Sequence, residues 1–344
     1  MVESLVAKLN PRAGRFTPKI INAIEQRFAE DYRVKIYSGN YPRRKTLQDK
    51  PQVITLGGGD GTIRYESNKF ILLCEELGLS FNKQLFAILK LGTGNAISYE
   101  LGAGKDHLEQ LEMILETDVN ELPTIQVPLI EITGTTPQGE KEKTYSMLTG
   151  AGWDGIILKK YKQSPLNGLV GYFSTIPSSA TEIFFGKKLK FEISFPQGAE
   201  LAEIFEEDIE FMRLPLGDGE RFLQENQIHA LVAGTTPYFG YNFVGFPYAK
   251  KARSEGKMHI RAVGGNRYSM IPRFVAHTKS IWSGEYRHRD VSEIVAPEVE
   301  IALLDKEASA QAGGDHFGEF TRINWKVSDY VLNLVDYNAM RTSS

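Results

Sequence analysis

The chain has 344 residues, of which 42% are hydrophobic and 24% are charged, and its formal net charge is −3. These values are typical of a soluble globular protein with two domains, and they exclude a bulk binder of polyanions, so we expect no nucleic-acid partner. The single cysteine, Cys74, excludes an internal disulfide. Because the sequence shows neither a secretory pattern nor an apolar run long enough to span a membrane, we expect a cytoplasmic protein without a transmembrane segment.

Strand and helix patterns alternate in the first third of the sequence. Short apolar runs predict strands at residues 5–9, 33–37, 53–56 and 85–89. Apolar residues at helical spacing predict helices after Thr17-Pro18, over 62–77 and over 106–117. This alternation predicts an α/β domain with a parallel sheet and helices on both faces, in which ligands bind at the carboxyl ends of the strands.

Glycine-rich or turn-forming loops follow three of these strands, at residues 10–14, 57–62 and 92–95. Glycines let backbone N–H groups approach a ligand, and a loop that opens onto a helix N-terminus favours phosphate. Asp60 would repel a phosphate unless a cation lay between them, and Mg²⁺ is the usual cation. The alternative interpretation is a tight strand-to-helix turn without a ligand.

The sequence changes character after Pro123. Short strands with alternating polarity are predicted at residues 124–127, 190–195, 228–233, 258–263 and 299–304. We therefore divide the chain into an α/β domain at 1–123, an antiparallel β-sandwich domain at 124–326 and a tail at 327–344. Helical interruptions are predicted around 166–185 and 269–277. In the tail, Val327, Val331, Leu334 and Val335 have helical spacing, and we expect the tail to pack back on the first domain.

The order of the motifs resembles the diacylglycerol kinase catalytic-domain superfamily of lipid kinases, which includes sphingosine and ceramide kinases. The matching motifs are Asn10-Pro11 with Gly14, Gly58-Gly59-Asp60-Gly61-Thr62, Gly92-Thr93-Gly94-Asn95, Gly150-Ala151-Gly152-Trp153-Asp154, residues 168–172, Phe246-Pro247-Tyr248-Ala249 with Glu255-Gly256, and Gly313-Gly314-Asp315. They span nearly the whole chain, and the glycine-aspartate loop is the most specific of them.

This resemblance implies a nucleotide-binding domain like that of NAD kinase and phosphofructokinase, followed by a β-sandwich, with ATP and Mg²⁺ in the cleft between them. It also implies transfer of the γ-phosphoryl group to a lipid hydroxyl. The implied cofactor-binding residues are Asn10, Gly58, Gly59, Asp60, Gly61, Thr62, Gly92, Thr93, Gly94 and Asn95. Asp60 would bind Mg²⁺, and Asp154 would lie near the lipid head group.

The base that takes the proton of the acceptor hydroxyl should come from a distant part of the chain, and we choose Asp315. Glu319 is the rival, and the alternative interpretation of Asp315 is an exposed residue in a hairpin turn where Gly314 supplies positive φ. Asp154 also has a second interpretation as a helix N-cap, because Ile156, Ile157 and Tyr161 follow at helical spacing.

Several positions depart from the family pattern. Ala96 stands at a usually acidic position, Tyr99 stands where Arg is common, and Glu66 is one place later than the usual glutamate. Glu255-Gly256 replaces Asp-Gly, which puts a structural metal of some members in doubt, and the late Asp-Gly-Glu becomes Gly313-Gly314-Asp315. These departures indicate a divergent subfamily, and the identity of the acceptor cannot be carried over.

Two other functions stay open. A soluble-metabolite kinase such as NAD kinase would share the glycine-aspartate loop, and an inactive ATP-binding or scaffold homologue would fit Ala96 and the altered motif at Asp315. The basic residues in the stretch at residues 183–190 would normally form a solvated face, and the aromatic residues beside them give the alternative of reversible docking at an anionic membrane surface. The oligomeric state is left open, a homo-oligomer included.

Overall fold

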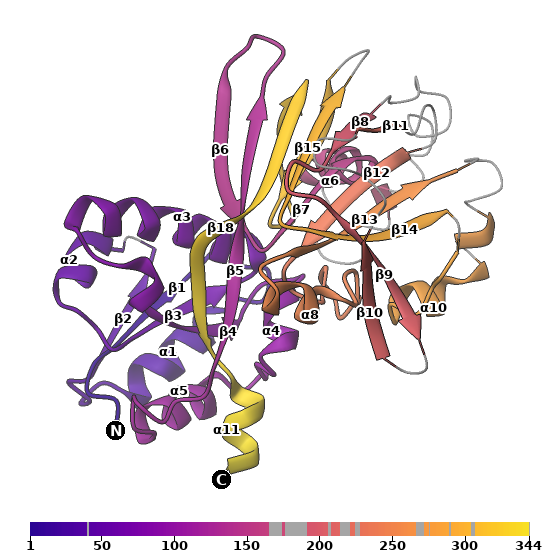
Figure 1. Cartoon of the computed structure of the whole chain (residues 1–344). Coiled ribbons are helices and arrows are strands. Elements are labelled where there is room, and N and C mark those ends of the chain that lie inside the picture. Colours follow the sequence, from indigo (N-terminus) through magenta and orange to yellow (C-terminus); the bar gives the residue numbers. More distant parts are fainter. Residues whose placement is uncertain are drawn as a thin grey trace. The chain divides into compact units, whose positions relative to one another are not determined.

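The computed structural model describes residues 1–39, 41–164, 174–175, 191–205, 208–213, 221–223, 228–265, 272–274, 276–288, 290–303 and 307–343. The chain forms two compact units (Figure 1). Unit 1 comprises Met1–Val127 and Tyr330–Ser344, and unit 2 comprises Pro128–Asp329. The boundaries between the units fall within two long strands, β5 (Thr124–Thr135) and β18 (Arg322–Val335).

Unit 1 is built on a parallel sheet with the strand order β2-β1-β3-β4-β18. Its first four strands are β1 (Leu5–Leu9), β2 (Val34–Ser38), β3 (Val53–Gly58) and β4 (Leu85–Lys90), and the last residues of β18 pair with β4. Every residue of β1 and β3 is buried, because these apolar strands lie at the centre of the sheet. The predicted α/β fold and its four strands are confirmed.

Six helices and a short 3₁₀ turn complete unit 1: α1 (Pro18–Arg27), α2 (Arg43–Gln48), α3 (Asp60–Leu77), η1 (Phe81–Lys83), α4 (Ala96–Glu100), α5 (His107–Glu116) and α11 (Tyr337–Ser343). Helix α1 packs on α5 and α2 packs on α3, on different sides of the sheet (Figure 1). Phe70 of α3 meets Phe86 of β4 edge-on, with ring centroids 5.7 Å apart. Cys74 on the same helix is buried, and burial raises the pKa of its thiol to about 11.

The helix that spacing predicts over 327–335 is wrong. These residues form the end of β18, where Asn333 pairs with Leu85 of β4. Apolar residues four positions apart fall on one side of a helix. They fit a strand equally well when other residues cover both faces of that strand. Valine favours the strand because its branched Cβ packs well on a pleated surface, and the exposed edge of β4 supplies backbone partners.

Unit 2 consists of two antiparallel layers. One has the order β10-β9-β14-β13-β12-β7-β16-β17, and the other contains β11-β8-β15-β18 with the β5–β6 hairpin. The strands not yet given are β6 (Lys141–Ser146), β7 (Leu148–Gly152), β8 (Phe191–Ser194), β9 (Glu200–Phe205), β10 (Asp208–Arg213), β11 (Arg221–Leu223), β12 (Ile228–Gly234), β13 (Met258–Gly264), β14 (Val291–Ala296), β15 (Glu298–Leu303), β16 (Ala308–Ala312) and β17 (Asp315–Phe320). Apolar side chains of both layers share one core around Trp325 and Phe320, which confirms the predicted sandwich.

Among the described residues of unit 2, the helices are α6 (Trp153–Gln163), α8 (Ala249–Ser254) and α10 (Thr278–Trp282). The predicted helix at 166–185, the motif at 168–172 and the basic stretch at 187–190 lie almost wholly outside the described residues. Residues 269–271 and 275 of the other predicted interruption also lie outside them. Among the helices that the structure describes, none combines the length and the apolar character needed to cross a membrane.

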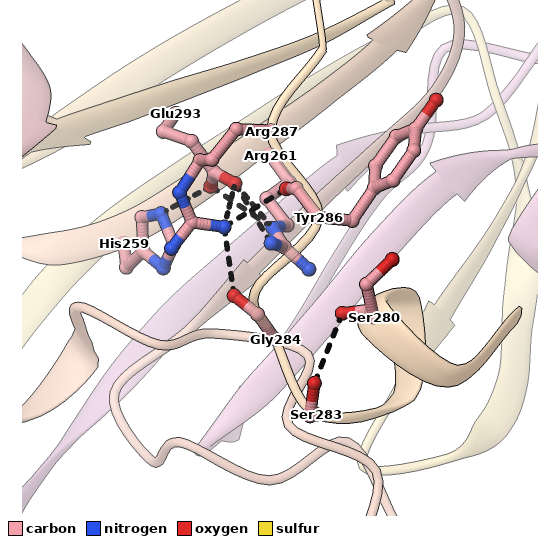
Figure 2. Close-up of polar contacts among 8 residues, drawn as sticks. All are labelled: His259, Arg261, Ser280, Ser283, Gly284, Tyr286, Arg287 and Glu293. Atoms are coloured by element: carbon pink, nitrogen blue, oxygen red, sulfur yellow. Dashed lines mark hydrogen bonds and ion pairs between the residues drawn. The ribbon is translucent and has the colours of Figure 1, made fainter. Parts of the chain in front are cut away.

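A buried charge network joins β13 to β14 in unit 2 (Figure 2). Arg261 donates to both carboxylate oxygens of Glu293, at 2.7–3.0 Å, and His259 Nε2 lies 2.8 Å from the same carboxylate. Burial alone would raise the pKa of Glu293, but His259 and Arg261 lower it to about 2. Because each charged group of this network has a charged or polar partner, we interpret the network as a structural link between β13 and β14. His259 is therefore a core histidine.

Candidate active site

The three loops identified in the sequence meet at one edge of the sheet in unit 1. The backbone N–H of Asn10 donates to Gly57 O at 2.8 Å, and its side-chain Nδ2 donates to Thr62 Oγ1 at 2.8 Å. The backbone N–H of Gly92 donates to Gly58 O at 2.9 Å. These bonds tie the first loop and the third loop to the glycine-aspartate loop, so the carboxyl ends of β1, β3 and β4 carry one continuous polar edge.

Two glycine contacts explain why these loops need residues without a side chain. A Cβ on Gly59 would lie 3.0 Å from the Cα of Gly92, and a Cβ on Gly14 would overlap the Thr93 hydroxyl. The backbones of the second and third loops are therefore packed directly against each other. This close approach is available only to glycine, and it leaves the backbone amides of the loops near the start of α3.

Asp60 is the first residue of α3 and is only 9% exposed. Its Oδ2 accepts a hydrogen bond of 2.9 Å from the backbone N–H of Ala96, at the start of α4. The carboxylate thus fixes the second loop to the third. Its place at a helix N-terminus, beside backbone amides, stabilises the ionised form.

Asn95 closes the third loop in a left-handed conformation with φ 55°, which asparagine tolerates better than most residues. Its Nδ2 donates to Gly92 O at 2.5 Å, and the side chain is fully buried. Within the described part of the chain, its Oδ1 has no hydrogen-bond partner. A buried amide oxygen of this kind is an acceptor available to a bound ligand.

The residues at this edge fit a magnesium ion that is shared with a phosphate. Mg²⁺ is usually held by one or two carboxylates, with phosphate and water oxygens completing the shell, and Asp60 supplies one such carboxylate. Among the described residues there is no cluster of three or more His, Cys, Asp or Glu side chains that would hold a metal without a ligand. The fit is therefore to a metal that arrives with a phosphate.

Asp154 lies in unit 2, in the first turn of α6, with Gly152 at the N-cap position. The prediction that Asp154 itself caps the helix is wrong, because the N-cap lies two residues earlier, at Gly152 with φ 91°. The side chain is buried, and burial raises its pKa to about 7 while the nearby Gln311 amide opposes the shift. No donor among the described residues meets its Oδ2.

Gln311 is a buried residue that the sequence analysis missed, and it connects Asp154 with the turn before Asp315. Its Oε1 accepts a hydrogen bond of 3.0 Å from Gly314 N, and its amide lies beside the Asp154 carboxyl. Asp315 follows Gly313 and Gly314, whose φ values are 60° and 78°, and is exposed at the start of β17. The hairpin geometry is present, and a catalytic role for Asp315 stays a prediction.

Glu319 on β17, the alternative candidate for the base, contacts a lysine and a histidine side chain. Its Oε1 lies 2.8 Å from Lys159 Nζ and 3.4 Å from His316 Nε2. Partial burial would raise the pKa of Glu319, but these two partners lower it overall. A carboxylate whose pKa is lowered in this way is a weaker proton acceptor.

The three loops at this edge lie in a segment that matches a known protein family. The family model of the diacylglycerol kinase catalytic domain matches residues 5–127, which carry all three loops. The match covers 123 of the 344 residues, the part of the chain that forms most of unit 1.

Two solved structures from Bacillus anthracis str. Sterne, each described as a proposed diacylglycerol kinase, share the fold of the chain. Both align with a TM-score of 0.58 and 14% sequence identity, over 98% of this chain and 98% or 99% of theirs. At this identity the likeness shows the fold alone. No curated protein sequence matches the chain significantly.

The structure gives physical meaning to two departures from the diacylglycerol kinase pattern. Glu66, one place late, is 2% exposed and paired with Arg43 of α2 through two bonds of 2.6 and 2.8 Å, so it joins α2 to α3. Glu255 forms an ion pair of 3.0 Å with Lys257. In this chain the two glutamates are engaged in ion pairs with cationic side chains.

Proposed function

We propose that the protein is an ATP- and Mg²⁺-dependent lipid kinase that transfers the γ-phosphoryl group of ATP to a lipid hydroxyl. The observation that carries the proposal is the joining of the three loops with the N-terminus of α3, inside the segment that matches the diacylglycerol kinase catalytic domain. Helix N-termini and glycine-rich amides are suited to polyphosphate.

In this proposal the chain positions the phosphates and offsets their charge. The glycines at 58, 59, 61, 92 and 94 allow backbone amides to approach the phosphate oxygens, while Asn10, Thr62, Thr93 and Asn95 supply side-chain donors and acceptors. Asp60 would hold the Mg²⁺, which when bound neutralises charge on the phosphates. Phosphoryl transfer needs little covalent help from a protein, so positioning and charge are the main contributions.

Two residues of unit 2 take the roles on the acceptor side. Asp315 accepts the proton of the acceptor hydroxyl, as an exposed carboxylate whose neighbour Gly314 is held by Gln311. Asp154 binds a polar group of the acceptor through its Oδ2. Its raised pKa supports this role, because a carboxyl that titrates near neutral pH both donates and accepts hydrogen bonds.

A lipid acceptor implies that the protein works at a membrane surface from the cytoplasm. The basis for this part of the proposal is the sequence at 183–190, which lies outside the described residues, and the family match. This stretch would dock reversibly through its aromatic and basic side chains, with an affinity that falls as salt is added.

The test is an acceptor panel. The protein is incubated with γ-labelled ATP, Mg²⁺ and, in separate reactions, vesicles that contain diacylglycerol, a sphingoid base or ceramide, and with soluble NAD. The proposal predicts a labelled lipid product in at least one vesicle reaction and none from NAD. Label on NAD alone would identify a soluble-metabolite kinase. Binding of ATP with no labelled product in any reaction would indicate an inactive nucleotide-binding homologue.

A further inference from the structure

Cationic side chains gather in unit 1 where β4 ends. Lys90 is the last residue of β4, is partly buried, and places its Nζ 3.6 Å from the centre of the Tyr99 ring. Arg15 is held beside it, because the backbone N–H of Arg15 donates to Leu91 O at 2.9 Å. Lys105 lies in the turn between α4 and α5, and it is close enough to act electrostatically on Lys90.

This gathering is electrostatically unfavourable in the chain alone. Partial burial lowers the pKa of Lys90, and the like charges of Arg15 and Lys105 lower it further. Within the described residues, none of the three forms an ion pair with a carboxylate, whereas cations elsewhere in unit 1 do, such as Arg27 with Glu112 and Lys35 with Asp49. Asp106, next to Lys105, is engaged with two backbone amides as the N-cap of α5.

Two of the three cations, Lys90 and Arg15, adjoin the glycine loops in the sequence and the fold. The third loop begins two residues after Lys90, and a Cβ on Gly14, next to Arg15, would overlap the Thr93 hydroxyl. A polyanion bound at this edge would offset the repulsion among the cations and would meet the loop amides at the same time.

We propose that Lys90, Arg15 and Lys105 form a phosphate-binding subsite at the carboxyl end of β4, and that the Tyr99 ring positions the Lys90 ammonium. The proposal rests on the proposed function, because it assigns a ligand contact to the same edge of unit 1. Lys90 is the central member, since it is the one held in place by both the strand and an aromatic face. A phosphate could reach this subsite on a nucleotide or on an anionic lipid, and the experiment separates these sources.

The experiment measures binding by the full chain and its variants with four probes: ATP, pyrophosphate, adenosine and vesicles of phosphatidylglycerol. Lys90→Gln should raise the Kd for pyrophosphate about tenfold or more, which is the usual effect of losing a hydrogen bond between charged groups. Lys90→Arg should restore most of the affinity, because it keeps the charge. Tyr99→Leu should weaken binding by a few-fold, since it removes only the aromatic face. Adenosine binding should not change in any variant.

Lys69→Gln is the matched control. Lys69 on α3 also lies over a tyrosine ring, with its Nζ 5.8 Å from the centre of Tyr65, but it is exposed and away from the loops. Its replacement should leave the binding of all four probes unchanged. An effect of Lys69→Gln equal to that of Lys90→Gln would mean that any lost lysine weakens anion binding, and it would overturn the subsite.

The outcomes separate the subsite from the kinase proposal. If Lys90→Gln weakens ATP and pyrophosphate binding, the phosphate belongs to the nucleotide, and if it weakens vesicle binding but not ATP binding, the phosphate belongs to a lipid. Either result supports the subsite. Unchanged binding of every phosphate probe in a folded Lys90→Gln variant, or no binding of any of them by the wild type, overturns it. A third result is that the wild type phosphorylates no acceptor while Lys90→Gln loses pyrophosphate binding. That result would overturn the kinase proposal and still support the subsite.

Discussion

Two buried aspartates, Asp60 in unit 1 and Asp154 in unit 2, stand in opposite electrostatic surroundings. Both lie in the first turn of a helix that follows a buried strand ending in glycine. Asp60 accepts a hydrogen bond from the Ala96 amide, at an edge that also holds Lys90 and Arg15. Asp154 has an oxygen that no described donor meets, and burial raises its pKa to about 7.

The difference shows that position at a helix start does not determine what a carboxylate can do. Where a carboxylate lies beside backbone amides at a helix start, as Asp60 does, it suits a metal ion that is shared with a phosphate. Where burial dominates, as at Asp154, the carboxyl group keeps its proton until near-neutral pH. Such a group suits hydrogen bonding with a neutral or cationic group of the substrate that accepts the phosphoryl group. Four tests would break or sharpen this contrast.

Replacing Asp60 should have the largest effect. Asp60→Asn keeps an oxygen that can accept from Ala96 N, so the fold should survive, but it removes the charge that would hold the Mg²⁺. We expect kcat to fall on the order of 10³–10⁵-fold, the size typical of lost charge stabilisation in phosphoryl transfer. Steady-state kinetics with the acceptor found in the panel measures this, with circular dichroism to check folding.

The control for Asp60 is Asp31→Asn, also in unit 1. Asp31 pairs with Arg33 at 2.7 Å, away from the glycine loops, so its replacement should leave kcat unchanged. A folded Asp60→Asn variant with wild-type kcat would remove the metal-binding role from Asp60.

The next largest loss of kcat is expected for the residue that accepts the proton of the acceptor hydroxyl. Asp315→Asn should lower kcat by ~10²–10⁴-fold, the usual loss for a general base, with ATP affinity nearly unchanged. Glu319→Gln should change kcat little, because Lys159 and His316 already hold that carboxylate and lower its pKa. The two variants are compared by kcat and by the Kd for ATP. If Glu319→Gln loses activity while Asp315→Asn keeps it, Glu319 is the base.

The raised pKa of Asp154 should make the free energy of unfolding depend on pH. The ordinary pKa of 3.8 is raised to about 7 in the folded state, so between these values the folded chain holds a proton that the unfolded chain has lost. The free energy of unfolding should therefore decrease as pH rises through this window, with a slope from this group of roughly 1.4 kcal/mol per pH unit at most. Asp154→Asn should remove that slope.

Chemical denaturation at a series of pH values across the window measures the slope. Asp31→Asn serves again as the control, because Arg33 lowers the pKa of Asp31 and its contribution changes only below the window. Equal slopes in wild type and Asp154→Asn would show that Asp154 does not retain its proton in the folded state.

The smallest effect is expected at the membrane surface. Lys187→Glu combined with Lys188→Glu should weaken sedimentation with anionic vesicles, because each basic residue near such a surface contributes about 1 kcal/mol. Added salt should weaken wild-type binding in the same direction. The charge-matched control is Lys19→Glu with Lys45→Glu, two exposed lysines of unit 1. Equal binding by both double variants would contradict docking through 187–190.

Local patterns predicted most of unit 1 because its strands, helices and loops follow one another within short stretches. The run at β3 and the glycines after it specify both the strand and the turn, and Pro18 marks the start of α1. The bounds of the parallel strands and the antiparallel character of unit 2 were also predicted. Periodicity failed at β18, where pairing with β4 decides the structure although the paired residues, Asn333 and Leu85, lie 248 positions apart in the sequence.

The parts of the site that sequence reasoning missed depend on contacts between distant residues. Gln311 reaches Asp154 only because β16 pairs with β7, and no local pattern distinguishes it from a surface glutamine. Lys90 looks like an ordinary strand end until Tyr99 and Arg15 are placed beside it. The available signal for Lys90 was a charged residue at the end of a buried strand, two residues before a glycine loop.

The most direct test of the kinase proposal follows the position of the label during phosphoryl transfer. Diacylglycerol vesicles, the first choice from the family match, are incubated with the protein, Mg²⁺ and ATP that is labelled either at the γ-phosphate or at the α-phosphate. We predict that label enters the lipid fraction from the γ-position only, and that Asp60→Asn abolishes it. Label in lipid from the α-position, or a wild-type chain that binds ATP but leaves every lipid acceptor unlabelled, would contradict the account.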